Sequence, residues 1–596
     1  MCGIFGIIAR EEHNLGPTMV EAGRMLSYRG YDSVGCATIN TKGEIDLRKD
    51  IGKVEEVAEK YDLENMTGKR GIVQLRWATF GAPSKVNAQP HLDSDGDLVG
   101  AHNGNVVNNV ELREQFIAEG MTVRSTNDGE SCVHAVERYV DQGFEMVEAI
   151  RKAYHDLEGD YAFTIGKADE DILYAFKKGS GLVAGITDDA AVISSDLPSL
   201  LPITRKIMRI EDGEIVILHP DRIELRSVED GSVIEREIEE VEETMEAAKK
   251  GSYPHFMLKE IYEQPVVAGE LLHMLDNSTE VDKIVERMKT ADNLYLVGCG
   301  TSYHACILGA VYFSRLAGKA AIPVLAPQFI AQYGPALGAD DVGMFVSQSG
   351  ETKDVLNAIE SAEKRDMGVL GLVNVIGSNL MRVSEHHVPL TCGYEISVPA
   401  TKTFTNQVIA FLYLAMRMGG HDTGELARLP DLMTETLEIS APQIEELAPT
   451  LAEVDDLYCL GYGLTYPIAL EAALKLKEIT YAHCEGMLST EFKHGPLSAV
   501  EEGYPVLFLS TKEDVDLIVS GINEVTCRGG KAIVFGEEDA RLRSNGDVMV
   551  NIPEADPNWS ALLSVLPMQL LSYHMSLGRG FDPDFPRNLS KTLTVD

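Results

Sequence analysis

A cysteine stands at position 2, directly after Met1, and it begins the stretch Cys2-Gly3-Ile4. A thiolate is a strong nucleophile, but an ordinary cysteine with a pKa near ~8.5 is mostly protonated at neutral pH. If Met1 is removed, the α-amino group of Cys2 titrates near ~8 and can accept the thiol proton without a histidine. One residue would then supply both nucleophile and base. The alternative is that Cys2 is a small buried side chain at the start of a strand.

Length and composition indicate a soluble multidomain protein. A chain of 596 residues is long enough for roughly three to four domains. No apolar run approaches the ~20 residues of a membrane span, and the N-terminus has no secretory signal pattern. The nine cysteines include no CxxC pair, which argues against a disulfide framework and a structural metal site. We therefore expect a cytoplasmic protein with neither a membrane partner nor a bound metal.

The charge balance is strongly acidic. The chain has 52 Lys and Arg residues against 93 Asp and Glu residues, and its formal net charge is −41. Such a surface repels phosphate backbones, so no nucleic-acid partner is expected. An anionic substrate must therefore be bound by local hydrogen-bond donors.

The pattern of apolar residues divides the chain into blocks. Up to residue 228, short β-type runs such as 71–75 and 161–165 alternate with Gly- and Asn-rich turns. A charge-dense segment over 229–254 is typical of a linker. Beyond it, apolar strands alternate with long helical stretches, which indicates parallel α/β sheets.

The second half has an internal repeat. A buried strand over 294–298 runs into a Gly-rich turn and a helix, and the run 457–463 repeats this arrangement. Each is followed by another apolar strand, 342–346 in the first case and 505–509 in the second. The sequence therefore predicts two doubly wound lobes, 255–430 and 445–580, followed by a tail over 581–596.

A hydroxyl-rich turn in the first lobe is a candidate phosphate site. Ser347, Gln348, Ser349 and Thr352 lie between a predicted strand and the start of a helix, where free N–H groups and the helix dipole favour anions. The chain has neither a Walker lysine nor a GxGxxG motif here, which favours a sugar phosphate over a nucleotide. Simple helix capping by Ser and Thr is the alternative. A second such turn carries the pair Thr301-Ser302.

Seven stretches together resemble one family, glutamine–fructose-6-phosphate aminotransferase (isomerising), also called glucosamine-6-phosphate synthase. The resemblance covers nearly the whole chain. It implies an α/β multidomain fold, with an N-terminal-nucleophile αββα glutaminase domain over 1–228 followed by two sugar isomerase (SIS) domains. It also implies L-glutamine and fructose 6-phosphate as substrates, no cofactor, and a homodimer. The stretches are Tyr28–Ser33, Arg76–Thr79, His102–Gly104, Ser347–Thr352, Lys475–Glu478, Lys493–Pro496 and Arg587–Lys591.

For the glutaminase domain, the resemblance assigns glutamine hydrolysis to Cys2 through a γ-glutamyl thioester. Asn103 and the Gly104 N–H would form the oxyanion hole. Arg76 would hold the substrate α-carboxylate, and Asp128 its α-ammonium group, with Thr79 as a further glutamine-binding residue. Asn103 and Asp128 could instead be ordinary turn residues.

The tryptophan next to Arg76, Trp77, would be the gate of an internal ammonia channel closed by the C-terminal tail. A core indole is the alternative.

For the SIS domains, the resemblance assigns an imine with the open-chain ketose to Lys591. Glu478 would move the proton between C1 and C2, His494 would help open the sugar ring, and Lys475 lies on the same helix face as Glu478. The residues alone leave other interpretations open. Lys475 and Glu478 could form a solvated ion pair, His494 could be a structural loop histidine, and Lys591 could belong to a frayed tail.

Two departures from the family pattern affect the expected site. Phe80 stands where histidine is usual, and Ala400 stands where serine is common. They bear on the binding of glutamine and on the identity of the sugar.

Three other classes of protein fit the sequence less well. Amidophosphoribosyltransferase requires a pyrophosphate loop with a hydroxyl after two aspartates, and the runs 187–190 and 339–342 lack it. Asparagine synthase requires a Ser-Gly-Gly nucleotide loop, which is absent. A phosphosugar-sensing SIS regulator would leave Cys2, Arg76, Asn103 and Asp128 unexplained. A glutamine amidotransferase that acts on a different ketose phosphate stays open.

Overall fold

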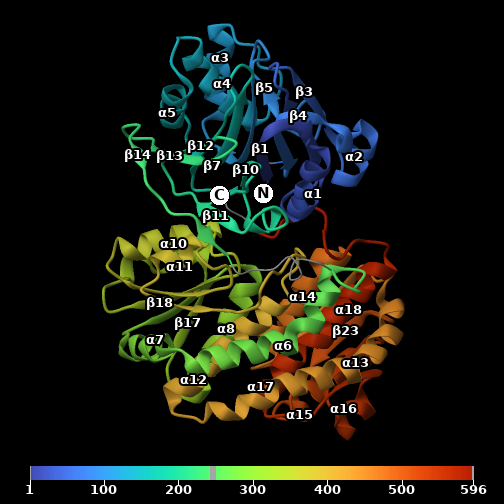
Figure 1. Ribbon diagram of the computed structural model, residues 1–596. Helices are drawn as coiled ribbons and strands as arrows, with labels where there is room; N and C mark the ends of the chain where they lie inside the picture. Colours follow the sequence, from blue (N-terminus) through green and yellow to red (C-terminus); the bar gives the residue numbers. More distant parts are fainter. Residues whose placement is uncertain (1, 79, 242–249, 593–596) are drawn as a thin grey trace. The chain divides into compact units, whose positions relative to one another are not determined.

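The computed structural model describes residues 2–78, 80–241 and 250–592, and it divides into two compact units (Figure 1). The first unit is described over 2–78 and 80–241, and the second over 250–591. None of the helices in the described residues is long and apolar enough to cross a membrane.

The first unit contains two antiparallel sheets. In the described residues, one sheet has the order β15-β11-β9-β10-β1-β4-β2-β3 and the other the order β14-β13-β12-β8-β7-β6-β5. The strands of the first sheet are β1 Gly3–Asn14, β2 Ser33–Ile39, β3 Ile45–Ile51, β4 Thr67–Arg76, β9 Val183–Ile186, β10 Ala190–Ser194, β11 Lys206–Arg209 and β15 Glu239–Glu240. The strands of the second are β5 His91–Leu92, β6 Leu98–Val106, β7 Gly159–Lys167, β8 Leu173–Lys178, β12 Glu214–Leu218, β13 Ile223–Ser227 and β14 Val233–Ile234.

Helices cover the outer faces of these sheets. Three hydrophobic cores define four layers: α1 and α2 pack on the first sheet, α3, α4 and α5 pack on the second, and the inner faces of the two sheets pack together. The helices are α1 Gly16–Leu26, α2 Val54–Tyr61, α3 Asn109–Glu119, α4 Asp128–Val140 and α5 Met146–Asp156. The αββα fold predicted from the family resemblance is confirmed.

The second unit contains two parallel five-stranded sheets with equivalent strand orders, β17-β16-β18-β19-β20 and β22-β21-β23-β24-β25. The predicted repeat of two doubly wound lobes is therefore confirmed. The strands are β16 Leu294–Gly298, β17 Ala321–Leu325, β18 Val342–Ser347, β19 Gly368–Val373, β20 His386–Pro389, β21 Asp456–Gly461, β22 His483–Leu488, β23 Pro505–Leu509, β24 Lys531–Glu537 and β25 Val548–Ile552.

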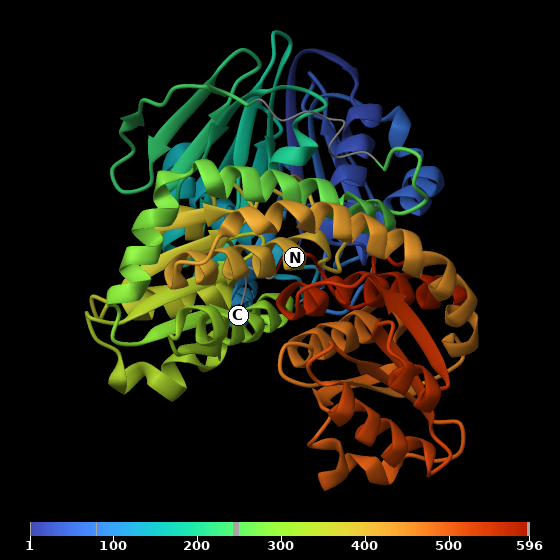
Figure 2. The same cartoon turned by 90° about the horizontal axis from the view of Figure 1, so that it is seen from below.

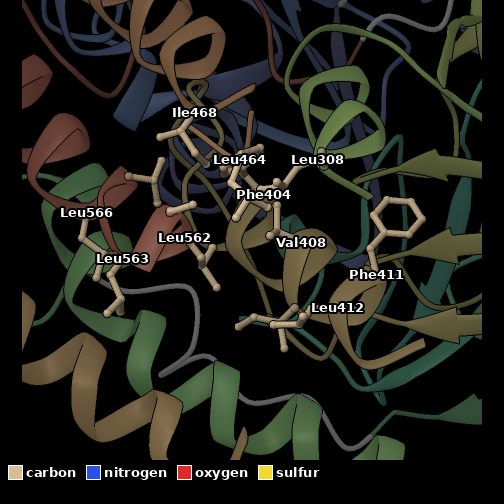
Figure 3. Packing of buried hydrophobic residues seen from close by; sticks show 14 of the residues in the cluster. Leu308, Phe404, Val408, Phe411, Leu412, Leu464, Ile468, Leu562, Leu563 and Leu566 are labelled. Carbon is tan, nitrogen blue, oxygen red and sulfur yellow. The ribbon is translucent and has the colours of Figure 1, made fainter. Parts of the chain in front are cut away.

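Helices of both lobes share one hydrophobic core. Side chains from α8 and α12 of the first lobe meet side chains from α17 and α18 of the second, together with Leu464, which precedes α14, and Ile468 in the first turn of α14 (Figure 3). The long helices α6 and α13 lie side by side (Figure 2). The helices are α6 Phe256–Asn277, α7 Thr279–Thr290, α8 Gly300–Ala317, α9 Phe329–Tyr333, α10 Lys353–Glu363, α11 Asn379–Val383, α12 Lys402–Gly419, α13 Leu429–Leu451, α14 Tyr466–Thr480, α15 Val515–Thr526, α16 Ala540–Asn545, α17 Pro557–Leu563 and α18 Val565–Gly578.

The predicted linker over 229–254 is only partly described. Its first part contains β14 and β15, which pair with β13 and β11 and so extend the sheets of the first unit. Residues 242–249 lie outside the described residues.

Candidate functional site

The thiol of Cys2 lies against the end of strand β4. Antiparallel pairing of β1 with β4 sets Gly3 opposite Leu75, which brings Cys2 to the residues that follow Leu75. The Trp77 N–H donates a hydrogen bond to the Cys2 Sγ at 3.3 Å, and the Cys2 side chain is 5% exposed. Burial raises the pKa of the thiol, and this effect outweighs the opposing influence of nearby Arg76. The thiol therefore needs a base before it can attack.

Arg76, the last residue of β4, is buried with unused donors. Its Nη2 donates to the carbonyl oxygens of Phe80 and of Gly81, the latter at 2.6 Å. Its Nε and Nη1 have no hydrogen-bond partner among the described residues. Buried guanidinium groups are ordinarily paired, so a buried guanidinium with two free donor nitrogens suits an anionic group of a substrate. Phe80 contributes only its backbone oxygen to this contact, so the contact does not depend on having phenylalanine where the family usually has histidine.

Asn103 and Gly104 lie within β6, which pairs with β7. Asn103 is buried, and its Oδ1 has no hydrogen-bond partner among the described residues. Gly104 has φ +110°, and a Cβ there would lie 2.0 Å from the backbone oxygen of Asp160. Only glycine fits this backbone, so the position of the Gly104 N–H is set by the strand pairing itself.

Asp128 is the first residue of α4 and is fully buried. Its Oδ2 lies 3.1 Å from His102 Nε2 and accepts a hydrogen bond from the Val106 N–H at 3.1 Å. Gln89 Nε2 lies 3.0 Å from the other ring nitrogen of His102. Beside the larger effect of burial, Asp128 raises the pKa of the Cys2 thiol and Arg76 lowers it. The sequence analysis did not assign a role to Gln89 or His102.

For Trp77 the structure gives the surroundings but does not test the predicted role, and Thr79 cannot be placed. The indole of Trp77 is half-buried and packs edge-to-face on Tyr31 at 5.9 Å between ring centroids. Its role as a channel gate stays a prediction. Thr79 lies outside the described residues.

The hydroxyl-rich turn follows β18 and precedes α10. The Ser347 Oγ lies 2.9 Å from the Thr352 Oγ1 and accepts a hydrogen bond from the Gly350 N–H at 2.9 Å. The Ser349 Oγ accepts one from the Glu351 N–H at 3.1 Å. These bonds hold the loop together, but Thr352, the N-cap residue of α10, makes no side-chain capping hydrogen bond to the described residues, so the simple capping role left open by the sequence is not what these hydroxyls do. Gln348 lies in the same turn, half-buried.

Thr301 and Ser302 lie in the first turn of α8, in the strand-to-helix arrangement that the sequence predicts. Their hydroxyls have different partners. The Ser302 Oγ accepts a hydrogen bond from Gln407 Nε2 at 3.0 Å, whereas the Thr301 Oγ1 donates to Glu471 Oε1 at 3.0 Å.

Lys475 and Glu478 form a buried ion pair on α14, and the solvated surface pair considered as an alternative is therefore wrong. The Lys475 side chain is 2% exposed, and its Nζ also lies 3.3 Å from Glu471 Oε1. Burial raises the pKa of Glu478 above its usual range, although Lys475 opposes the shift. The two carboxylates raise the pKa of Lys475 despite burial, so it is an ammonium at neutral pH. A carboxylate with a raised pKa suits proton transfer.

Lys591 is ordered and buried, in contrast to the frayed tail that the sequence alone allows. Its Nζ forms an ion pair with Glu395 Oε2. Glu395 also accepts hydrogen bonds from the backbone N–H groups of Thr401 and Thr403, at 2.9 and 3.0 Å. Burial opposes the ionisation of Glu395, but Lys591 and these donors hold its pKa below the usual range. Burial raises the pKa of Glu478, and Lys591 opposes that rise to a small extent, as Lys475 does more strongly.

Glu471 and Glu395 were not among the residues that the sequence predicts for the site. A carboxylate one helical turn before Lys475 was the available signal for Glu471. Glu395 gave no signal, because its partners lie in a loop and in the tail. His494 was expected to help with ring opening; it lies exposed at the end of a short 3₁₀ turn, Phe492–His494, and its role stays a prediction. In the described part of the chain, no group of three or more His, Cys, Asp or Glu side chains is arranged to hold a metal ion.

Comparison with known families agrees with this division of the chain. The SIS domain model matches residues 287–417 and 450–579, and the glutamine amidotransferase domain model matches residues 76–202. A solved structure described as the C-terminal domain of glucosamine-fructose-6-phosphate aminotransferase from Francisella tularensis has a TM-score of 0.52 and 30% identity. It covers 56% of this chain and 99% of its own.

Curated relatives match over their full length. Glutamine--fructose-6-phosphate aminotransferase [isomerizing] from Methanothermobacter thermautotrophicus is 39% identical over 602 residues, with 100% of both chains covered. The protein of the same name from Thermococcus kodakarensis is 38% identical over 610 residues, again with 100% of both chains covered. The chain therefore belongs to the glutamine–fructose-6-phosphate aminotransferase (isomerising) family, as its motifs predict.

Proposed function

We propose that this protein makes glucosamine 6-phosphate and glutamate from fructose 6-phosphate and L-glutamine. The observation that carries the proposal is the presence of two buried ion pairs in one unit, Glu478 with Lys475 and Lys591 with Glu395. Imine formation with a ketose requires an amine, and its isomerisation to an aldose requires a carboxyl group that can take and return a proton. Both groups lie in the unit that carries the hydroxyl-rich turn.

In the glutaminase half, Cys2 Sγ attacks the side-chain carbonyl carbon of glutamine. With Met1 removed, the α-amine of Cys2 takes the thiol proton. The developing oxyanion accepts hydrogen bonds from the Asn103 side chain and the Gly104 N–H, donors of a kind whose loss typically costs ~10²–10³ in rate. Ammonia leaves as the C–N bond breaks, and water then hydrolyses the thioester to glutamate. Arg76 binds the α-carboxylate, and Asp128 the α-ammonium group.

In the SIS half, the turn from Ser347 to Thr352 binds the phosphate group, and His494 assists ring opening. The Lys591 ammonium first gives its proton to the Glu395 carboxylate with which it pairs, and its Nζ then attacks C2 of the open-chain ketose. Water leaves, and ammonia replaces the lysine at C2 of the imine. Glu478 takes a proton from C1 and returns one to C2, which converts the ketose imine into the amino aldose.

We further expect a cytoplasmic homodimer without a membrane or nucleic-acid partner. The acidic net charge of −41 supports the absence of a nucleic-acid partner. We also expect Trp77 to gate the passage of ammonia, since its backbone touches the Cys2 thiol while its ring packs on a neighbouring aromatic side chain.

Replacing Arg76 by Lys tests the glutamine carboxylate site. Lysine keeps the charge but has one nitrogen in place of the separate Nε and Nη1 donors, so the KM for glutamine should rise about 10-fold or more in a glutaminase assay. Arg70→Lys is the matched control, because Arg70 is also buried on β4 and bonds to the backbone oxygens of Lys167 and Ala168. Equal KM values in wild type and Arg76→Lys, or equal rises in both variants, would argue against this role.

Replacing Thr352 by Val tests the phosphate site without changing side-chain size. Hydrogen bonds to charged groups are worth ~1.5–3 kcal/mol, so the Kd for fructose 6-phosphate should rise about 10-fold or more, while weak binding of fructose is unchanged. Titration calorimetry gives both values. Thr434→Val on α13 is the control, because its hydroxyl is exposed and bonds to the Pro430 carbonyl oxygen. Parallel losses for both sugars in Thr352→Val would show that the hydroxyl only supports the loop.

Borohydride reduction tests the imine. When borohydride is added with fructose 6-phosphate, peptide mapping by mass spectrometry should find the sugar on Lys591. Lys591→Arg should prevent labelling, because a guanidinium stays protonated. The same variant should keep basal glutaminase activity. Labelling of Lys475 instead would mean that the reacting amine is on α14.

A further inference from the structure

Glu471 joins the two lobes of the second unit. It lies on α14 of the second lobe with no exposed surface, and it bonds to two residues in the first two turns of α8, which belongs to the first lobe. Thr301 Oγ1 donates to Glu471 Oε1 at 3.0 Å, and His304 Nδ1 lies 2.7 Å from Oε2. The hydrophobic core shown in Figure 3 packs side chains of these same two helices together.

The two oxygens of Glu471 are not equivalent. Oε1 has two donors, Thr301 and the Lys475 ammonium. Among the described residues, His304 is the one donor to Oε2. Burial opposes the ionisation of Glu471, but these cationic and polar partners hold its pKa below the usual range. An ionised carboxylate only accepts hydrogen bonds, so His304 carries its proton on Nδ1.

Lys475 is shared between two carboxylates, Glu471 and Glu478. If Oε2 lost its only donor, a buried anionic oxygen would stay unsatisfied, which is costly. The Lys475 ammonium, whose Nζ already lies 3.3 Å from Oε1, carries the charge that would compensate it, and moving toward Oε2 takes that ammonium away from Glu478. The His304 hydrogen bond thus keeps Lys475 on the carboxylate that transfers the proton.

We propose that His304 is a positioning residue for sugar isomerisation, which acts through Glu471 and Lys475 on Glu478. It touches none of the reacting atoms. The inference rests on the proposed role of Glu478 and extends it to a residue on the other lobe. The groups that face Glu478 electrostatically are Lys475 and Glu471 on α14 and Lys591 on the tail.

The test compares His304→Asn with His304→Leu in the full-length protein. The Asn Nδ2 group can take the place of His Nδ1 as a donor to Oε2, whereas Leu has similar size and no donor. We expect His304→Leu to lower kcat for glucosamine 6-phosphate formation about 10-fold or more, with little change in the KM for fructose 6-phosphate. His304→Asn should stay within about threefold of wild type. Basal glutaminase activity should be unchanged in both.

A pH profile separates positioning from general loss of structure. Glu478 must be ionised to accept a proton, and Lys475 lowers its pKa. The acid limb of kcat should therefore move to higher pH in His304→Leu but stay in place in His304→Asn. His483→Leu is the control, because it removes an exposed His–Asp pair from the second lobe.

Three results would overturn the proposal: an unchanged kcat in His304→Leu, equal losses in both His304 variants, or a reduced kcat with an unmoved acid limb. Failure of the proposed function itself is distinguishable, because wild type would then form no glucosamine 6-phosphate.

Discussion

The buried carboxylate of Glu471 is the contact on which the arrangement of the isomerase groups depends. An isolated charge in a protein interior is costly, so each charged group in this region has an opposite charge or several donors beside it. Glu471 draws its donors from α8 of the first lobe and from Lys475 on its own helix. Lys475 in turn contacts Glu478. The packing of two lobes and the ionisation of Glu478, the proposed proton-transfer group, are therefore linked through His304, Glu471 and Lys475.

Buried charged groups have partners in the second unit, whereas one buried cation in the first unit keeps unpaired donors among the described residues. In the second unit, Lys591 and Glu395 satisfy each other, and backbone N–H groups complete the carboxylate. In the first unit, Arg76 keeps two buried donors without partners among the described residues. The free donors of Arg76 suit a site that takes its counter-charge from a substrate. The closed pair at Lys591 suits a site whose amine must be released before it reacts.

The sequence predicted the fold more completely than the site. The apolar runs 294–298 and 457–461 became β16 and β21, because Gly-rich turns limited each run at its end. Spacing also predicted that Lys475 and Glu478 share a helix face. It did not predict that the pair is buried, since burial depends on the packing of α14 against α8 and α18.

Contacts between residues that are distant in the sequence could not be predicted either, because they also depend on tertiary packing. Thr301 was grouped with the phosphate-binding residues because it follows a strand, yet its hydroxyl bonds to a carboxylate 170 residues away. The pairing of Lys591 with Glu395 spans 196 residues. No periodic pattern in the sequence indicates either contact, because both depend on how whole helices and loops pack against one another.

The central claim is that one chain transfers the amide nitrogen of glutamine to a ketose phosphate. The direct measurement is incubation with glutamine labelled with ¹⁵N at the side-chain amide, together with fructose 6-phosphate, followed by NMR of the products. The account predicts ¹⁵N at C2 of glucosamine 6-phosphate in wild type, and no label in that product with Cys2→Ser. Release of ¹⁵N-ammonia with fructose 6-phosphate unchanged, or equal labelling by Cys2→Ser, would contradict it.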